Sequence, residues 1–202
     1  MSAICGLFFR QSQPFNIAML SSMMKRLAYR WIDGEAEWHH TSTGFGIQKL
    51  NITPESLNEV LPFYDLNHQL AIVADARIDN REELYQKLNI SVSSQTMSDS
   101  TLILRAYQKW GATCGEHLLG DFIIVIWDNK NKQLVFITDA LGVRSVYYYI
   151  NDQIVAFASE IKALLALPQV PRKPNLRKIA LINFLAEDSA ESYFEEIFSV
   201  PA

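Results

Sequence analysis

The sequence has few cysteines and no grouped metal ligands. Its two cysteines, Cys5 and Cys114, lie far apart in 202 residues and suggest no disulfide framework, which is typical of a reducing compartment. Four histidines are present, and His39 and His40 are adjacent on a predicted strand, where their side chains point to opposite faces. We therefore expect a cytoplasmic protein without a metal site.

Long apolar runs and an excess of basic residues are also missing. Each apolar stretch ends well before the roughly 18 residues that a membrane helix needs. Arg10 falls where the apolar segment of a signal peptide would continue. The net charge is −4 with no basic stripe, and no repeat or low-complexity segment occurs. Neither a membrane nor a nucleic acid is expected as a partner.

The composition, with 49% apolar and 20% charged residues, is typical of a globular protein. Apolar periodicity predicts a buried strand at residues 3–10, a further strand at 69–78, and hairpins at 36–50 (turn near Ser42–Gly44), 121–140 and 145–160. It also predicts helices at 15–30, 80–88, 98–110 and 160–167, with Asn80 capping the second and Ser98 or Asp99 the third. Strands with helices outside them indicate an α+β domain of two antiparallel sheets.

Several short motifs occur in an order that is informative. They are "CGLF", "YRWIDGE", "GIQKLNI", "ADARIDNREEL", "SDSTLILRAYQKWG", "HLLGDFIIVIWDNKNKQLVFITDALGVRSVYYY" and "FASEIKALLALP". In this order they resemble the glutamine-hydrolysing domain of asparagine synthetases, a class II glutamine amidotransferase of the N-terminal-nucleophile hydrolase superfamily. The resemblance implies a four-layer αββα sandwich over residues 1–202, with its core in about 1–170 and a connection toward a synthetase domain in 171–202.

The same resemblance implies the partners. Glutamine is the expected substrate, and a synthetase domain or subunit is the expected recipient of its ammonia. No cofactor is expected in this domain, because ATP and Mg²⁺ belong to the synthetase, whose Ser-Gly-Gly-x-Asp-Ser motif this sequence does not contain. The apolar stretch Ile179–Leu185 predicts a patch that is covered by self-association or by the synthetase.

The resemblance also assigns a nucleophile. Cys5 matches the family's cysteine, provided that Met1–Ile4 are removed so that its α-amino group becomes free to act as a base. Ser2 would become N-terminal after removal of Met1 and is itself a nucleophile, but it points to the opposite face of the strand from Cys5 and is discounted. Without the resemblance, Cys5 is most often a buried strand cysteine.

Four further positions match the family's substrate pocket. Lys49 stands where the family has arginine and keeps the positive charge without the bidentate fork. Leu50 and Ile52 match pocket positions, and Asp99 matches the aspartate that takes the substrate ammonium. From the residues alone, Lys49 is a surface lysine and Asp99 a helix N-cap.

The oxyanion hole is where the sequence departs most from the family. Asp75 replaces the asparagine whose amide donates to the oxyanion, and a carboxylate has no N–H to donate. Ala76 replaces glycine and keeps a backbone N–H, whereas Arg77 replaces glutamate among the substrate-binding positions. Alternatively, Asp75, Arg77 and Asp79 form a salt-bridged turn at a solvated strand end.

Three functions follow from these alternatives. The first is a glutaminase that releases ammonia for a synthetase. The second is a catalytically degenerate scaffold that supports an asparagine-synthetase-like module, of the kind that closes lasso peptides or β-lactams. The third is a sensor that binds an amino acid between Lys49 and Asp99 without turnover.

Overall fold

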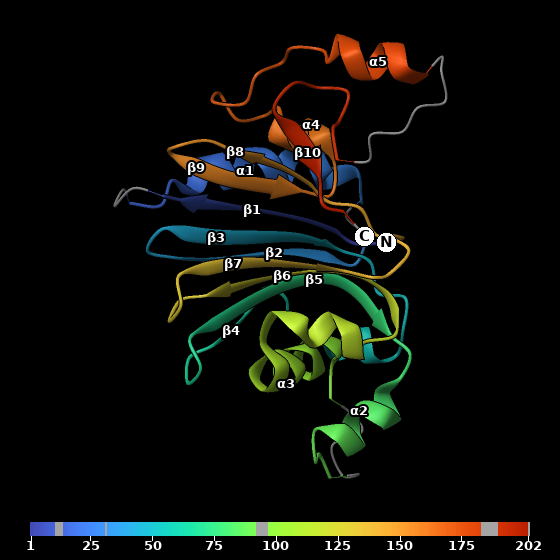
Figure 1. Cartoon of the computed structure of the whole chain (residues 1–202). Helices are drawn as coiled ribbons and strands as arrows, with labels where there is room; N and C mark the ends of the chain where they lie inside the picture. The colour runs from blue at the N-terminus through green and yellow to red at the C-terminus, as the bar shows by residue number, and fades with distance from the viewer. Residues whose placement is uncertain (11–13, 31, 92–96, 183–189, 202) are drawn as a thin grey trace.

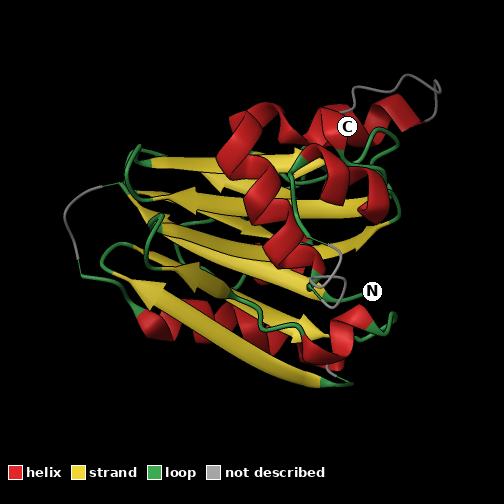
Figure 2. Cartoon of the chain, turned by 90° about the horizontal axis from the view of Figure 1, so that it is seen from below, coloured by secondary structure: helices red, strands yellow, loops and turns green. Residues whose placement is uncertain are grey.

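The computed structural model describes the chain except for residues 11–13, 31, 92–96, 183–189 and 202. It consists of two stacked antiparallel sheets with helices on both outer faces, which is the expected αββα sandwich (Figures 1 and 2). The first sheet has the strand order β10-β8-β9-β1-β3-β2 and the second has the order β4-β5-β6-β7.

The predicted strands and hairpins are present, and two short edge strands, Phe63–Asp65 and Ile197–Ser199, were not predicted from the sequence. The strands are β1 (Ala3–Phe9), β2 (Gly34–His40), β3 (Thr43–Lys49), β4 (Phe63–Asp65), β5 (Leu70–Ile78), β6 (Gly120–Asp128), β7 (Gln133–Thr138), β8 (Tyr147–Ile150), β9 (Ile154–Ala158) and β10 (Ile197–Ser199). The β2–β3 turn is tighter than predicted, because His40 pairs with Thr43 and only Thr41 and Ser42 remain for the turn.

The helices lie on the outer faces of the two sheets. They are α1 (Ile17–Leu27), α2 (Arg81–Lys87), α3 (Asp99–Trp110), α4 (Ile161–Leu164) and α5 (Leu176–Ile182). Helices α1 and α4 cover the first sheet, and α2 and α3 lie beyond the second (Figure 1). Ser98 is the N-cap of α3, since its Oγ accepts from the N–H of Thr101. Asn80 precedes α2 without capping it, and its side chain instead donates to His117 O and accepts from Leu119 N.

The two faces of β1 belong to two different cores. Alternate residues of β1 on the outer face pack against α1 and α4; they are Ala3, Cys5, Leu7 and Phe9. On the inner face Ile4 packs with Phe45 and with the buried residues of the second sheet. A Cβ on Gly6 would lie 2.4 Å from the ring of Phe157, so the close approach of this ring requires glycine. Which face of β1 reaches the space between the sheets is therefore fixed by packing.

The C-terminal segment contributes to the first sheet, because β10 pairs with β8 at its edge. The domain boundary near residue 170 remains a prediction. Of the expected apolar patch, Ile179 is 41% exposed, and residues 183–185 lie outside the described residues.

Within the described ranges, every helix falls short of the length and apolar character that a bilayer crossing requires. The same part of the chain contains no group of three or more His, Cys, Asp or Glu residues that could hold a metal ion.

Candidate functional site

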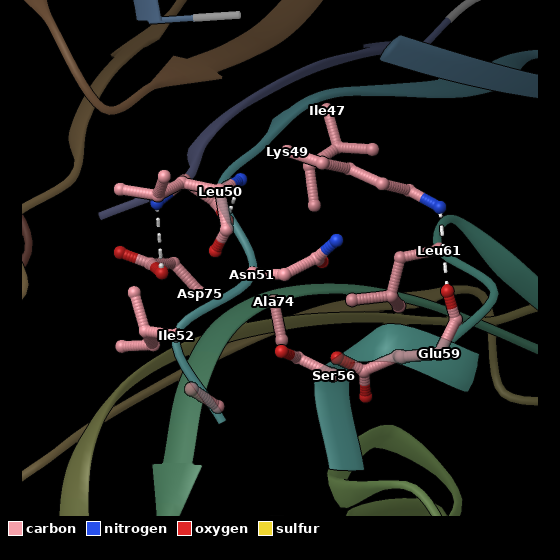
Figure 3. A pocket seen from close by; sticks show the side chains of 12 residues that line it. Ile47, Lys49, Leu50, Asn51, Ile52, Ser56, Glu59, Leu61, Ala74 and Asp75 are labelled. Carbon is pink, nitrogen blue, oxygen red and sulfur yellow. Dashed lines mark hydrogen bonds between the residues drawn. The ribbon is translucent and has the colours of Figure 1, made fainter. Parts of the chain in front are cut away.

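A pocket lies where the start of β1, the segment after β3 and the middle of β5 meet (Figure 3). Its lining residues are Ser2, Ile47, Lys49, Leu50, Asn51, Ile52, Ser56, Glu59, Leu61, Ala74, Asp75 and Ala76. Five of the eight residues predicted for the site are among them, namely Lys49, Leu50, Ile52, Asp75 and Ala76. The other three, Cys5, Arg77 and Asp99, are not in this lining.

Ser2 is one of two serines, with Ser56, that line this pocket. Its Oγ accepts a hydrogen bond from the N–H of Leu50 at 3.1 Å and donates to Leu50 O at 3.3 Å. Its backbone N–H donates to Oδ1 of Asp75 at 3.1 Å. The first residue before β1 is thus tied to both neighbouring walls of the pocket.

Cys5 lies on the other face of β1 and is completely buried. Burial raises the pKa of its thiol, and the charge of Glu37 raises it further. Cys5, the residue that matches the family's nucleophile, is therefore not accessible from the pocket. The sequence correctly places Ser2 and Cys5 on opposite faces, but the cleft is on the face of Ser2, because the odd-numbered residues of β1 pack under α1.

Asp75 is held by a partner that sequence reasoning missed. Its Oδ2 accepts from Nη1 of Arg144 at 3.0 Å, and the two side chains are only 10% and 5% exposed. Burial raises the pKa of Asp75, while Arg144 and the N–H of Ser2 act in the opposite direction. Both carboxylate oxygens are engaged. No local motif identifies Arg144, because it comes from the loop before β8, 69 positions along the chain.

Ser2 and Asp75 also border a second pocket. Its other lining residues are Met1, Arg30, Ile123, Val143, Arg144, Ser145 and Ser159. Ser2 and Asp75 line both pockets, so they stand between them. Met1 occupies the wall of the second pocket and is 52% exposed.

Arg77 is in the lining of neither pocket and is partly exposed. Its guanidinium pairs with Asp79 at 2.9 Å and with Asp121 at 3.4 Å. The predicted salt-bridged turn forms between Arg77 and Asp79, and Asp75 is not part of it, because its carboxylate is held by Arg144. A substrate-binding role for Arg77 has no geometric support.

Asp99 is the first residue of α3 and is 5% exposed. It forms an ion pair with Arg81, and its Oδ2 accepts from the N–H of Ile78 at 3.3 Å. Burial raises its pKa to about 6; the charge of Glu59 adds to this rise, and Arg81 opposes it. Its carboxylate is already satisfied inside the protein.

An αββα sandwich in which the start of the first strand enters a pocket between two antiparallel sheets is the architecture of N-terminal-nucleophile hydrolases. The chain belongs to the glutamine amidotransferase domain family, whose model matches residues 1–202. The resemblance drawn from the motifs and the fold class expected from it are both confirmed.

Curated relatives agree with this assignment. The chain is 26% identical over 195 residues to asparagine synthetase [glutamine-hydrolyzing] 2 of Bacillus subtilis, covering 96% of this chain and 26% of that protein. It is 28% identical over 156 residues to amidase chry2 of Gibberella zeae, covering 75% of this chain and 23% of that protein. The chain thus spans about a quarter of the length of these relatives.

A solved structure supports the fold. Glutamine phosphoribosylpyrophosphate amidotransferase from B. subtilis superimposes with a TM-score of 0.61 at 16% identity, over 81% of this chain and 43% of that chain. At this level of identity the likeness concerns the fold alone.

Proposed function

We propose that this domain hydrolyses the side-chain carboxamide of glutamine, with Ser2 as nucleophile, and supplies ammonia to an asparagine-synthetase-type module. The observation that supports the proposal is that Ser2 lines the pocket, immediately before the strand that leads between the sheets. Cys5 carries no part of the reaction, because it is sealed beneath α1.

The chemistry requires that Met1 be removed. The free α-amino group of Ser2 then takes the proton of Oγ, and Oγ attacks the carboxamide carbon. The resulting tetrahedral oxyanion collapses to a seryl ester as the C–N bond breaks, and the leaving nitrogen takes the proton and departs as ammonia. Water then hydrolyses the ester and releases glutamate. None of these steps uses a cofactor, so ATP and Mg²⁺ are assigned to the synthetase.

Asp75 makes this a slow catalyst. It offers no N–H to the oxyanion, which leaves the backbone N–H of Ala76 as the donor that the family pattern supplies. The ion pair with Arg144 reduces the repulsion between Asp75 and the oxyanion, because it offsets the negative charge of Asp75 beside the reacting centre. Asp75 also accepts from the nitrogen of Ser2, so a free ammonium there is held in its charged form and is a poorer base.

The test is ammonia release from glutamine by protein whose N-terminus is established by intact mass. We expect turnover only from chains that begin at Ser2, loss of turnover in Ser2→Ala, and unchanged turnover in the matched control Cys5→Ala. Asp75→Asn should raise turnover by about 100-fold, the usual effect of one oxyanion donor. Turnover that survives in Ser2→Ala and disappears in Cys5→Ala overturns the proposal.

A second function, a scaffold without hydrolysis, is favoured by one observation. Both oxygens of Asp75, the residue that stands at the family's oxyanion-hole position, are engaged in structural contacts. In that case neither the wild type nor Asp75→Asn releases ammonia, and the domain supports its synthetase by docking alone. The two buried free cysteines are consistent with a cytoplasmic location for either function.

A further inference from the structure

A carboxylate that the sequence motifs do not mark lines the pocket at Glu59. This residue follows the short 3₁₀ helix Glu55–Asn58, and its side chain lies beside Ser56 (Figure 3). Its Oε1 accepts from the N–H of Ser100 at 2.7 Å, which fixes the carboxylate against the start of α3. In the described part of the chain, Oε2 has no hydrogen-bond or ion-pair partner. Glu59 therefore lines the pocket with a carboxylate that is anchored through one oxygen and has its second oxygen without a partner among the described residues.

Lys49 supplies the opposite charge on the same side of the pocket. Its Nζ donates to the backbone O of Glu59 at 3.3 Å (Figure 3). One backbone acceptor leaves two of the three ammonium N–H groups available for a ligand. An ammonium and a carboxylate that line one small pocket match the two charges of an α-amino acid.

Asp99, the expected ammonium ligand, is unsuited to that task. Its two oxygens are taken by Arg81 and by the N–H of Ile78, and it is outside the pocket lining. A ligand ammonium could reach it only by displacing a guanidinium that also donates to Tyr85 and Met97.

The local charge balance favours a cation at Glu59. Burial is the largest cause of the raised pKa of Asp99, and the charges of Glu59 and Glu55 raise it further, so both carboxylates lie close enough to Asp99 to repel it. Arg81 is paired with Asp99, and Lys49 contacts the backbone of Glu59 rather than its carboxylate. Binding of an ammonium beside Oε2 would relieve this repulsion.

We propose that Glu59 is the residue that recognises the α-ammonium of the amino-acid ligand, in place of Asp99, with Lys49 on its α-carboxylate. This inference rests on the proposed function for the identity of the ligand, glutamine. If Glu59 has this role, a ligand must carry a free α-ammonium group in order to bind. Asp99 then acts only within the protein, through its contacts with Arg81 and Ile78.

The test is calorimetric binding of glutamine to the Ser2→Ala protein, in which the ligand is not consumed. Glu59→Gln keeps an oxygen for Ser100 and should weaken glutamine binding about 10- to 100-fold, the usual effect of losing one charge-assisted hydrogen bond. Asp99→Asn is the matched control and should change the affinity less than 3-fold. Circular dichroism establishes that both variants are folded.

An analogue that carries a hydroxyl in place of the α-ammonium provides the second arm. It should bind weakly and equally well to Ser2→Ala with and without Glu59→Gln. The inference is overturned if Glu59→Gln binds glutamine as the parent does, if Asp99→Asn is the weakened variant, or if glutamine does not bind at all. Ammonia release by the wild type is scored separately, so absent turnover with Glu59-dependent binding refutes only the proposed function.

Discussion

Two nucleophilic side chains, Ser2 just before β1 and Cys5 within it, point to opposite faces of this strand and lie in very different environments. Ser2 faces the second sheet, lines a pocket and is bonded to Leu50 and Asp75. Cys5, three positions along the strand, is buried under α1 with a raised pKa. A sulfur atom is the better nucleophile in water, but only as a thiolate that substrate can reach. The comparison shows that the burial and surroundings of a side chain, rather than whether it carries oxygen or sulfur, decide whether it can react.

The sharpest test of this difference is thiol labelling under native conditions. We expect Cys5 to be unreactive toward an aromatic disulfide reagent, since it is buried and its thiolate is disfavoured. Cys114 is also buried, with a pKa raised to about 11, and should behave alike. A Ser2→Cys variant should add one thiol that reacts at least about 1000-fold faster. Equal rates for the native and added thiols would show that the two faces do not differ.

The inner face should be more sensitive to charge than the outer face. Arg144→Met leaves Asp75 buried without its ion-pair partner and should lower the free energy of unfolding by about 3–5 kcal/mol, as measured by urea denaturation. Adding Asp75→Asn to this variant removes the uncompensated charge and should restore most of the loss. If the double variant is as unstable as the single one, the ion pair is not what Arg144 contributes.

Exchanging oxygen and sulfur at the two positions should give unequal effects. Cys5→Ser places a hydroxyl in an apolar cluster and should cost about 1–3 kcal/mol of unfolding free energy. Ser2→Cys, at the edge of a pocket, should cost less than about 1 kcal/mol. Chemical denaturation of the two variants beside the wild type measures both values, and a reversed order would contradict the assigned faces.

The buried carboxylates on the inner side of the fold should make the stability of the protein depend on pH. Asp99 has a folded-state pKa of about 6, above the ordinary value of 3.8, so the folded chain retains a proton that the unfolded chain releases. Its contribution to stability is therefore complete below about pH 4 and is lost as the pH rises through 6, by no more than about 3 kcal/mol. Burial also raises the pKa of Asp75, so its contribution to stability changes with pH in the same direction.

Asp99→Asn should make the unfolding free energy less dependent on pH between pH 4 and pH 7. In the Ser2→Cys background, the same substitution should not change the rate at which the thiol at position 2 is labelled. Denaturation curves at several pH values measure the slope of the unfolding free energy against pH. An unchanged slope would assign the titration to another group, of which Asp75 is the first to test by substitution to asparagine.

The sequence by itself determined the local structure and the family. The continuous apolar run at residues 3–9 and the choice of Ser98 or Asp99 as the cap of α3 are local signals. The structure has a buried strand at the first and a cap at Ser98 in the second. The ordered motifs identified the glutamine amidotransferase family and thereby the αββα arrangement. The strand alternation also placed Ser2 and Cys5 on opposite faces of β1.

Only the tertiary structure decided which of those faces is the site. That choice depends on where α1 packs, and nothing within residues 1–9 records it. The ion pairs Asp75–Arg144 and Asp99–Arg81, and the hydrogen bond that Ser100 donates to Glu59, likewise join residues that are 69, 18 and 41 positions apart. Such contacts arise because the two sheets and α3 bring distant segments together, so the charges that shape the pocket are set by packing and not by any local pattern.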